Sequence, residues 1–182
     1  MGASYVSAGK PNVAGAIYRA PLGSTLPTDA TTALDVAFVH LGYASEDGVV
    51  NENTPETDEV KAWGGDTVLT LQTEKNDTFT VTLLETMDVN VLSAIYGSAN
   101  VSGTLSSGIT VSANGSEAVE ASWVFEIALR GGGYKRICIP DGKITEIGEI
   151  TYTDDQAIGY EITITAFVDS SGNTHYEYIK RT

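Results

Sequence analysis

The chain has 182 residues, a length that fits a single domain spanning residues 1–182 with a core of its own. Its 10 basic and 24 acidic residues give a formal net charge of −14. This excess of acid argues against a protein that grips nucleic acid and against a polybasic membrane-surface protein. The composition, 42% hydrophobic and only 19% charged, is that of a folded chain, and a single cysteine excludes an internal disulfide.

The first third of the chain contains two different kinds of segment. Residues 1–33 show little periodicity and are rich in Gly, Ala, Pro, Ser and Thr, so we expect an extended N-terminal arm and not a core element. Residues 36–43 place mostly apolar side chains at both sets of alternating positions. That pattern predicts a strand buried on both faces.

Residues 46–66 form a long acidic segment. Its first 14 residues hold six acidic side chains and no basic one. The NENTPET stretch and the Gly64-Gly65 pair are typical of a loop, with room for short strands at 49–50 and 60–63. Loops of this length in a small domain are usually functional or disordered. Val49, Val60 and Trp63 supply apolar anchors, which favours a loop that a partner orders.

A hairpin and a helix are predicted next. Alternating residues over 67–74 and 78–85 predict two strands, with Lys75-Asn76-Asp77 as the turn between them. Residues 88–96 predict the one convincing helix, since Asp88 is a good N-cap and Gly97 can end the helix. So short a helix must pack on the sheet to be stable.

The second half of the chain is predicted to be all strand. Residues 119–130 alternate strongly, a Gly131–Gly133 turn follows, and Pro140-Asp141-Gly142 is a second turn signal. The expected strands occupy 134–140, 143–153, 160–168 and, within a C-terminal strand or arm at 169–182, residues 175–179. About eight strands and one helix predict a mainly β sandwich or barrel-like fold with the helix on its flank.

The sequence contains few candidates for chemistry. His40 lies in an apolar strand and is interpreted as structural, while His175, near the end of the chain, favours a surface or interface role. Cys138 lies among apolar residues as a small core side chain. The glycines at 131–133 lack the spacing of a phosphate loop, and residues 169–174 lack the glycine of a calcium loop. We therefore expect no catalytic residue, no cofactor and no metal, and not an enzyme.

Four stretches of the chain together resemble a known family. They are NVAGAIYRAPLGSTLPTDATTALD, LGYASEDGV, KAWGGDTVLTLQTEKNDTFTVTLLET and GYEITITAFVDSSGNTHYEYIK, and within them KAWGGD and TLQTEKNDTF are the most specific. In this order they look like the major tail tube protein of long, non-contractile-tailed bacteriophages, particularly those of Gram-positive hosts. The resemblance covers nearly the whole chain, from about Asn12 to Lys180.

The resemblance implies both a fold and a role. The fold is two packed antiparallel sheets with a flanking helix, at residues 88–96 here. Family members assemble in the host cytoplasm as hexameric rings stacked into the tube of the virion tail. The tube surrounds a tape-measure protein, meets tail terminator and distal tail proteins, and lets genomic DNA pass without specific binding or any membrane contact. The segment 46–66 would be the loop that joins rings. Candidate inter-ring contacts are Val49, Val60, Trp63, Tyr176 and Tyr178.

The acidity then acquires an interpretation. Like charge on the wall of the lumen would keep DNA phosphates from sticking. Glu120, Glu126 and Glu161 are candidate lumen acids because they alternate with core positions along strands. The alternative for these residues is that they face outward and keep the tube soluble.

A different functional class and a related tail role remain open. The nine tyrosines and two tryptophans could serve a carbohydrate-binding or adhesion β-sandwich module of a phage or bacterial surface. Against this, Trp123 belongs to a predicted core face, and no second exposed aromatic lies beside Trp63 in the sequence. A terminator or baseplate-hub relative would share the tail tube fold.

Overall fold

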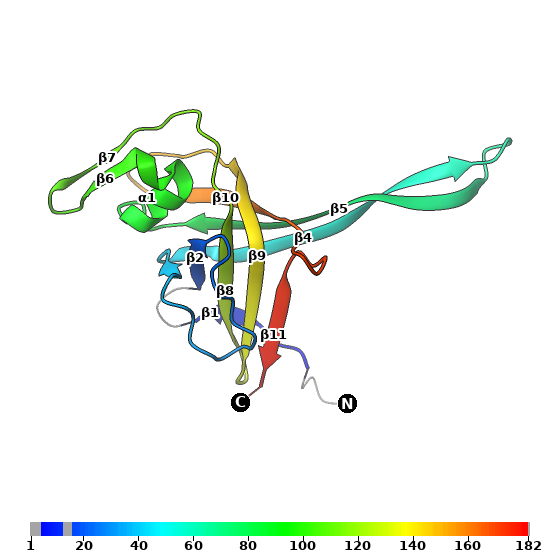
Figure 1. Ribbon diagram of the computed structural model, residues 1–182, viewed down its shortest axis with the longest axis horizontal. Helices are drawn as coiled ribbons and strands as arrows, with labels where there is room; N and C mark the ends of the chain where they lie inside the picture. Colours follow the sequence, from blue (N-terminus) through cyan, green and yellow to red (C-terminus); the bar gives the residue numbers. More distant parts are fainter. Residues whose placement is uncertain (1–4, 13–15, 182) are drawn as a thin grey trace.

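The computed structural model describes residues 5–12 and 16–181 (Figure 1). Residues 1–4, 13–15 and 182, which belong to the predicted arms, lie outside the described part. The elements in chain order are β1 (Gly9–Pro11), β2 (Ile17–Pro21), β3 (Val39–His40), β4 (Ala44–Lys61), β5 (Thr67–Leu83), α1 (Val89–Tyr96), the 3-10 helix η1 (Ser98–Asn100), β6 (Val101–Thr104), β7 (Gly108–Val111), β8 (Ala121–Leu129), β9 (Tyr134–Ile147), β10 (Tyr160–Ala166) and β11 (Tyr176–Lys180).

The strands form two antiparallel sheets. The large sheet has the order β3-β2-β8-β9-β10-β5-β4, with β1 added beside β8 and β11 added beside β9, and β6 and β7 form a second, two-stranded sheet. Strand β9 joins the halves of the large sheet, because its first part pairs with β8 and β11 and its last part pairs with β10. The predicted mainly β class with two antiparallel sheets and a flanking helix is confirmed, and the described strands do not close into a barrel.

Two apolar clusters hold this arrangement together. The larger one draws side chains from β2, β5, β8, β9, β10 and α1. At its centre Trp123 is completely buried, and its indole Nε1 donates to the Gly142 carbonyl at 3.0 Å. Phe79 and Phe125 stack beside it with ring centroids 5.6 Å apart. A smaller cluster on the other face of β8 and β9 contains Val124 and Cys138.

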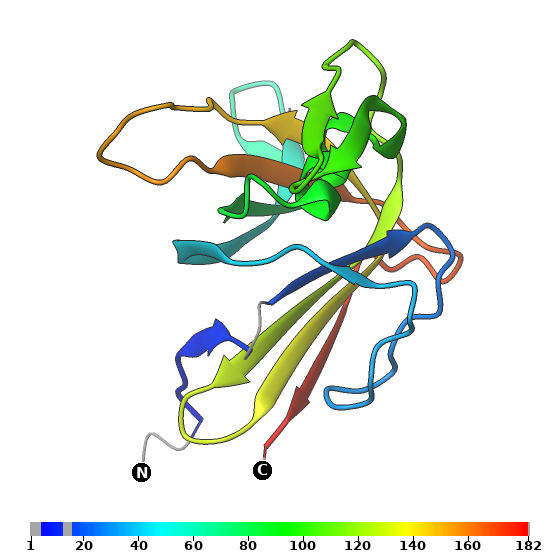
Figure 2. The same cartoon turned by 90° about the vertical axis from the view of Figure 1, so that its left-hand side faces the viewer.

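Helix α1 lies where the sequence predicts it. The Asp88 carboxylate accepts a hydrogen bond from the Asn90 amide, and the Gly97 amide donates to the Ser93 carbonyl. These contacts satisfy backbone groups that a helix end otherwise leaves unpaired. The apolar face of the helix is buried in the larger cluster. Figure 2 shows α1, β6 and β7 grouped at one end of the body, with β8, β9 and β11 running toward the opposite end.

Three strands follow the sequence prediction closely. Strands β8, β10 and β11 overlap the segments predicted at 119–130, 160–168 and 175–179. The chain also turns between β8 and β9 at residues 131–133, as predicted.

The N-terminal segment is different from the predicted arm. Strands β1 and β2 both pair with β8, and Ile17 and Ala20 are buried. Residues 17–21 are therefore a core strand, so the prediction of an extended arm over residues 1–33 is wrong for them. The strand predicted over 36–43 is also wrong for most of its length. Asp35 begins a turn, with its carboxylate accepting from the Ala37 amide, and Val36 is fully exposed.

Strand β9 runs straight through a predicted turn. Residues 140–142 lie within β9, where a register shift against β8 leaves Gly142 paired with Ala121 and Ala166. The strands expected at 134–140 and 143–153 are therefore one strand that ends at Ile147. Gly142 marks the place where β9 changes partners. A Cβ on this residue would lie 3.0 Å from the side chains of Trp123 and Ile164. The turn-like residues therefore permit close packing in the middle of a strand.

Candidate functional site

The most prominent feature of the molecule is a β-hairpin that projects far beyond the body (Figure 1). It consists of β4 and β5, paired from Ala44↔Leu83 to Lys61↔Thr67. The chain reverses at residues 62–66, where the Ala62 amide donates to the Asp66 carbonyl at 2.8 Å. Gly64 and Gly65 have φ values of 123° and 101°, which residues with a side chain rarely adopt.

The bounds of this hairpin differ from the sequence prediction in two places. Most of the acidic segment 46–66 is strand β4, not a loop, and the predicted turn Lys75-Asn76-Asp77 lies inside β5. Asn76 pairs with Thr54 and Asp77 pairs with Asn53. The true turn is therefore about ten residues earlier in the chain than the predicted one.

The hairpin has a packed base and an unpacked distal half. Between residues 77 and 83 of β5, every second side chain is buried, including Phe79, Val81 and Leu83. From residue 67 to residue 76, every residue of β5 is exposed, on both faces of the ribbon. An isolated two-stranded ribbon is only marginally stable in water. The distal half is thus the part of the body's sheet that lacks a covering layer.

A buried polar network lies where the hairpin leaves the body. Asp77 is 1% exposed, and its carboxylate accepts from Asn51 Nδ2 at 2.8 Å and from Thr174 Oγ1 at 2.5 Å. His175 Nδ1 lies 2.5 Å from the same carboxylate, and its ring meets the edge of Phe79. His175 is therefore not a free surface side chain, contrary to the surface role predicted for it. Its ring connects the segment before β11 to the base of β5.

One face of the distal half combines apolar and acidic side chains. Residues that lie directly opposite each other in an antiparallel pair share a face, and alternate residues of one strand do so too. Glu56, Asp58 and Val60 alternate along β4, and their partners are Glu74, Leu71 and Leu69, so these six side chains share one face. A register shift between Glu56 and Thr57 adds one residue to β5 between Glu74 and Gln72. We call the shared face the acid–apolar face: Glu56, Asp58, Val60, Leu69, Leu71 and Glu74.

The acid–apolar face is unusual for a free surface. Val60, Leu69 and Leu71 are 44–50% exposed, and Trp63 at the tip is fully exposed. Glu56 and Glu74 are direct cross-strand neighbours of like charge, an arrangement that destabilises a sheet. No Lys or Arg among residues 5–12 and 16–181 forms an ion pair with a carboxylate of this face. Within the described chain, the carboxylates of this face have no cationic partner, and its apolar side chains have only each other beside them and no covering layer.

The predicted inter-ring residues fall into two groups. Val60 and Trp63 lie on the exposed distal half of the hairpin, whereas Val49 is half-buried against the main core. Tyr176 and Tyr178 stack on each other in β11 with ring centroids 6.4 Å apart, and both pack against the smaller cluster. Of the five predicted residues, Val60 and Trp63 are thus the two on the exposed hairpin, and the other three belong to the body. Leu69 and Leu71 were missed by the sequence analysis, although their alternation in β5 marked them.

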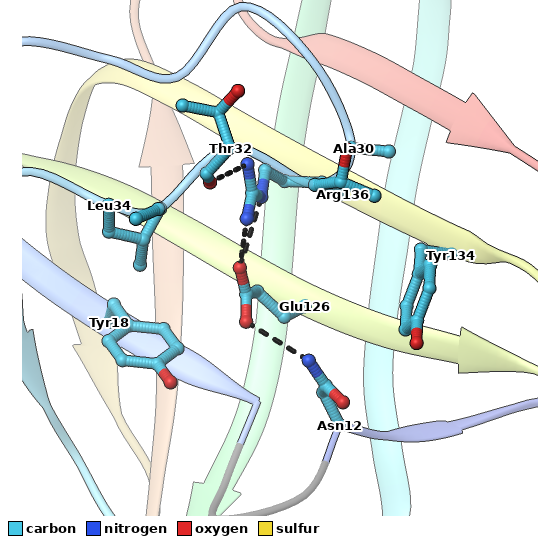
Figure 3. A pocket seen from close by; sticks show the side chains of 10 residues that line it. Asn12, Tyr18, Ala30, Thr32, Leu34, Glu126, Tyr134 and Arg136 are labelled. Atoms are coloured by element: carbon cyan, nitrogen blue, oxygen red, sulfur yellow. Dashed lines mark hydrogen bonds and ion pairs between the residues drawn. The ribbon is translucent and has the colours of Figure 1, made fainter.

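Of the three candidate lumen acids, Glu126 has a separate role inside the body (Figure 3). Arg136 donates from Nε and Nη2 to Glu126 Oε1, and from Nη1 to the carbonyls of Asp29 and Thr32. The Arg136 side chain is only 5% exposed, and that of Glu126 is 14% exposed. The pair fixes the segment around residues 29–32 against β9. Glu120 and Glu161 are exposed.

The remaining candidates for chemistry have inert surroundings. Burial raises the pKa of the Cys138 thiol to about 12, so it is not a thiolate nucleophile at neutral pH. His40 Nδ1 accepts a hydrogen bond from the Gly42 amide, and its ring lies against Tyr18. Within the described residues, no group of three or more His, Cys, Asp or Glu side chains is placed to hold a metal ion.

None of the helices in the described chain is long and apolar enough to cross a membrane.

Comparison with known proteins gives one finding that spans almost the whole chain. A family model described as phage tail tube protein matches residues 8–182. No curated protein matches the chain. The matched region includes every element of the large sheet and the whole projecting hairpin.

Proposed function

The chain belongs to the phage tail tube protein family, and from this membership and the form of the hairpin we propose that it polymerises as stacked hexameric rings into the tube. The family is one of structural proteins of the virion tail that assemble with copies of themselves into a tube. We further propose that the tube is that of a long, non-contractile tail of a phage with a Gram-positive host. Its assembly would take place in the host cytoplasm, without membrane contact.

The single observation that carries the ring-stacking proposal is the two-sided exposure of the distal hairpin. Leu69 and Leu71 are each about half exposed, on a ribbon with no covering layer of its own. Burying apolar surface is the main driving force of association. A second copy that covers this ribbon would supply the layer that the body supplies at the hairpin base. We therefore propose that the distal hairpin, with Val60 and Trp63, makes the contact between rings.

Unpaired sheet edges support closure into a ring. Strand β4, 18 residues long, is an outer strand of the large sheet. A long free edge invites pairing with another chain, and ring closure by a repeated head-to-tail contact removes such edges. Val49, Tyr176 and Tyr178 belong to the packed body, so any contact they make between copies would come from the body and not from the hairpin.

The proposed lumen holds the tape-measure protein first and passes genomic DNA later, while the tube ends meet terminator and distal tail proteins. Six copies together carry about −84 formal charges, six times the −14 of one chain. A negatively charged wall would repel phosphate and let DNA pass without binding. We keep Glu120 and Glu161 as proposed lumen acids. Glu126 is withdrawn because Arg136 neutralises it inside the body.

An aromatic carbohydrate platform is not supported by the structure. Trp123 is buried and hydrogen-bonded to a carbonyl in the core. Tyr176 and Tyr178 are half-buried against the smaller cluster. We therefore do not propose the glycan-binding alternative.

Negative-stain electron microscopy of the purified protein at increasing concentration tests the proposal. We expect rings and tubes at high concentration and monomers at low concentration. The double variant Leu69→Ser/Leu71→Ser should form no tubes. The control Val36→Ser/Val168→Ser changes two exposed valines of the body and should polymerise normally. Monomers of wild-type protein at every concentration would contradict the proposal.

A further inference from the structure

A compact basic surface lies at the end of the body where β8 turns into β9. The registers Lys10↔Ala128 and Lys180↔Tyr134, together with Ala128↔Tyr134, place four strands side by side there. Since opposite residues share a face, the side chains of Lys10 and Lys180 lie on one face of these strands. Arg130 lies at the same end, in the turn just beyond Leu129, where its amide donates to the Ala8 carbonyl. We call these three residues the basic face. In Figure 1 the turn between β8 and β9 and the end of β11 lie at the lower end of the body, beside the C-terminus.

The cations of the basic face have no acidic partner of their own. All three are exposed, and the Lys180 ammonium donates a 3.4 Å hydrogen bond to Thr31 Oγ1. Within residues 5–12 and 16–181, no carboxylate forms an ion pair with Lys10, Arg130 or Lys180. Nearby Lys135, which points to the other face, is already paired with Glu177 at 2.6 Å. In a chain of net charge −14, three neighbouring cations without a carboxylate are a marked local exception.

The acid–apolar face and the basic face complement each other in charge and in number. One offers three carboxylates, from Glu56, Asp58 and Glu74, around an apolar strip. The other offers three cations beside the half-buried ring of Tyr134. Within one molecule the hairpin extends away from the end of the body that carries the basic face (Figure 1). A contact between them must therefore join two molecules.

We propose that the acid–apolar face of the hairpin docks on the basic face of a second copy of this chain. This inference rests on the proposed function and names the receiving surface of the ring-to-ring contact. Docking would place cations beside the like-charged pair Glu56–Glu74, and would cover Leu69 and Leu71 with the ring of Tyr134. The two faces lie on different parts of the molecule, so the contact is head-to-tail and repeats without limit.

Charge reversal with rescue is the decisive experiment. The variant Lys10→Glu/Arg130→Glu/Lys180→Glu should raise the concentration needed for tubes by at least about ten-fold, because like charges would then face each other. The variant Glu56→Lys/Asp58→Lys/Glu74→Lys should do the same. Combining all six changes should restore tubes. Circular dichroism and thermal unfolding of each monomer report whether the variants fold.

Two controls separate charge complementarity from net charge. The variant Glu149→Lys/Asp154→Lys/Asp155→Lys alters the net charge as much as the hairpin variant does, at exposed positions outside both faces, and should polymerise normally. Lys10→Arg/Lys180→Arg keeps the charge and should also polymerise. Normal tubes from the variant with a reversed basic face would overturn the proposal. So would a six-fold variant that folds but forms no tubes.

Disulfide trapping tests the contact independently of tube formation. The native Cys138 is buried, so cysteines introduced by Glu74→Cys and Arg130→Cys would be the only accessible thiols of the described chain. We expect oxidation of a mixture of the two single variants to yield a covalent dimer, and a mixture of Asp155→Cys with Arg130→Cys to yield none. If wild type never forms tubes but the dimer forms, the proposed function fails and this contact stands. If tubes form but no dimer appears, the contact is wrong.

A nucleic acid is the other occupant that a basic surface could take. If the basic-face variant polymerises normally but loses binding of a short DNA duplex that wild type retains, the surface binds phosphate. That result would overturn the proposal.

Discussion

The base and the distal half of the β4–β5 hairpin are built from the same two strands, yet only the base has a core. In the base, β5 alternates between buried and exposed residues because β10 and the larger cluster cover it. In the distal half, the strands stay paired through two register shifts, and no layer covers them. Backbone pairing therefore defines the shape of the ribbon, whereas burial depends on a neighbour. The body thus has a core of its own, whereas the distal half lacks a covering layer within the described chain, and we propose that a second chain supplies it.

The largest expected difference between the body and the distal half is the loss of unfolding free energy when the tryptophan of each is replaced by alanine. Trp123→Ala removes a completely buried side chain at the centre of the core, so we expect it to lower the free energy of unfolding by about 3–5 kcal/mol. Trp63→Ala removes a fully exposed side chain at the tip. This variant should change the free energy of unfolding by less than about 0.5 kcal/mol. Denaturant unfolding of the monomers measures both. Equal losses would mean that the tip packs on its own body.

The boundary between the two regions can be weakened at Asp77. Asp77→Asn replaces a buried acceptor of three side chains by an amide, and we expect a loss of about 1–3 kcal/mol in unfolding free energy. Hydrogen exchange should speed up around residues 51–53 and 174–176. Asp66→Asn, at the exposed turn, is the matched control and should leave both measurements unchanged. Unaltered exchange at the hairpin base would show that the network does not hold it.

The smallest expected change in monomer stability comes from the like-charged pair Glu56–Glu74 in the distal half. Glu74→Lys converts Glu56↔Glu74 into a cross-strand pair of opposite charge, which should stabilise the monomer by about 0.2–1 kcal/mol. The same change should weaken tube formation, because it removes one carboxylate from the acid–apolar face. Thermal unfolding and electron microscopy measure the two effects, with Asp155→Lys as the control for net charge. A variant that is more stable and also polymerises better would indicate that Glu74 has no assembly role.

The sequence predicts well those segments in which burial of one face gives a regular spacing of apolar residues. Strands β8 and β10 alternate because one face of each packs in the core, and α1 has both a cap residue and an apolar face. The distal hairpin has no buried face, so its β4 strand shows no clear alternation of apolar and polar residues. Pro55 fits within β4 because this strand is at the edge of the sheet, where a missing N–H donor is tolerated. An acidic strand of this kind is easily taken for a loop.

Two turns were predicted at residues that lie inside strands, because residue types that are common in turns have another role at each place. Asp77 follows Asn76 in what resembles a turn, but its carboxylate is the acceptor of a buried network. Gly142 follows Pro140 and Asp141, but it leaves room for Trp123 where β9 changes partners. The candidate site was predicted in part, since Val60 and Trp63 do lie on the exposed hairpin. Its basic counterpart depends on the pairing of β1 and β11 with the β8–β9 pair, which one sequence does not reveal.

The continuity of β5 has a mechanical consequence. This strand runs unbroken from Thr67, beside the tip, to Leu83 in the core. Hydrogen bonds of an antiparallel ladder lie perpendicular to the strands, so a pull along the hairpin loads many of them together in shear. Peeling would break them one at a time. A tensile load applied at the tip would therefore reach the centre of the body directly, with no flexible joint in between.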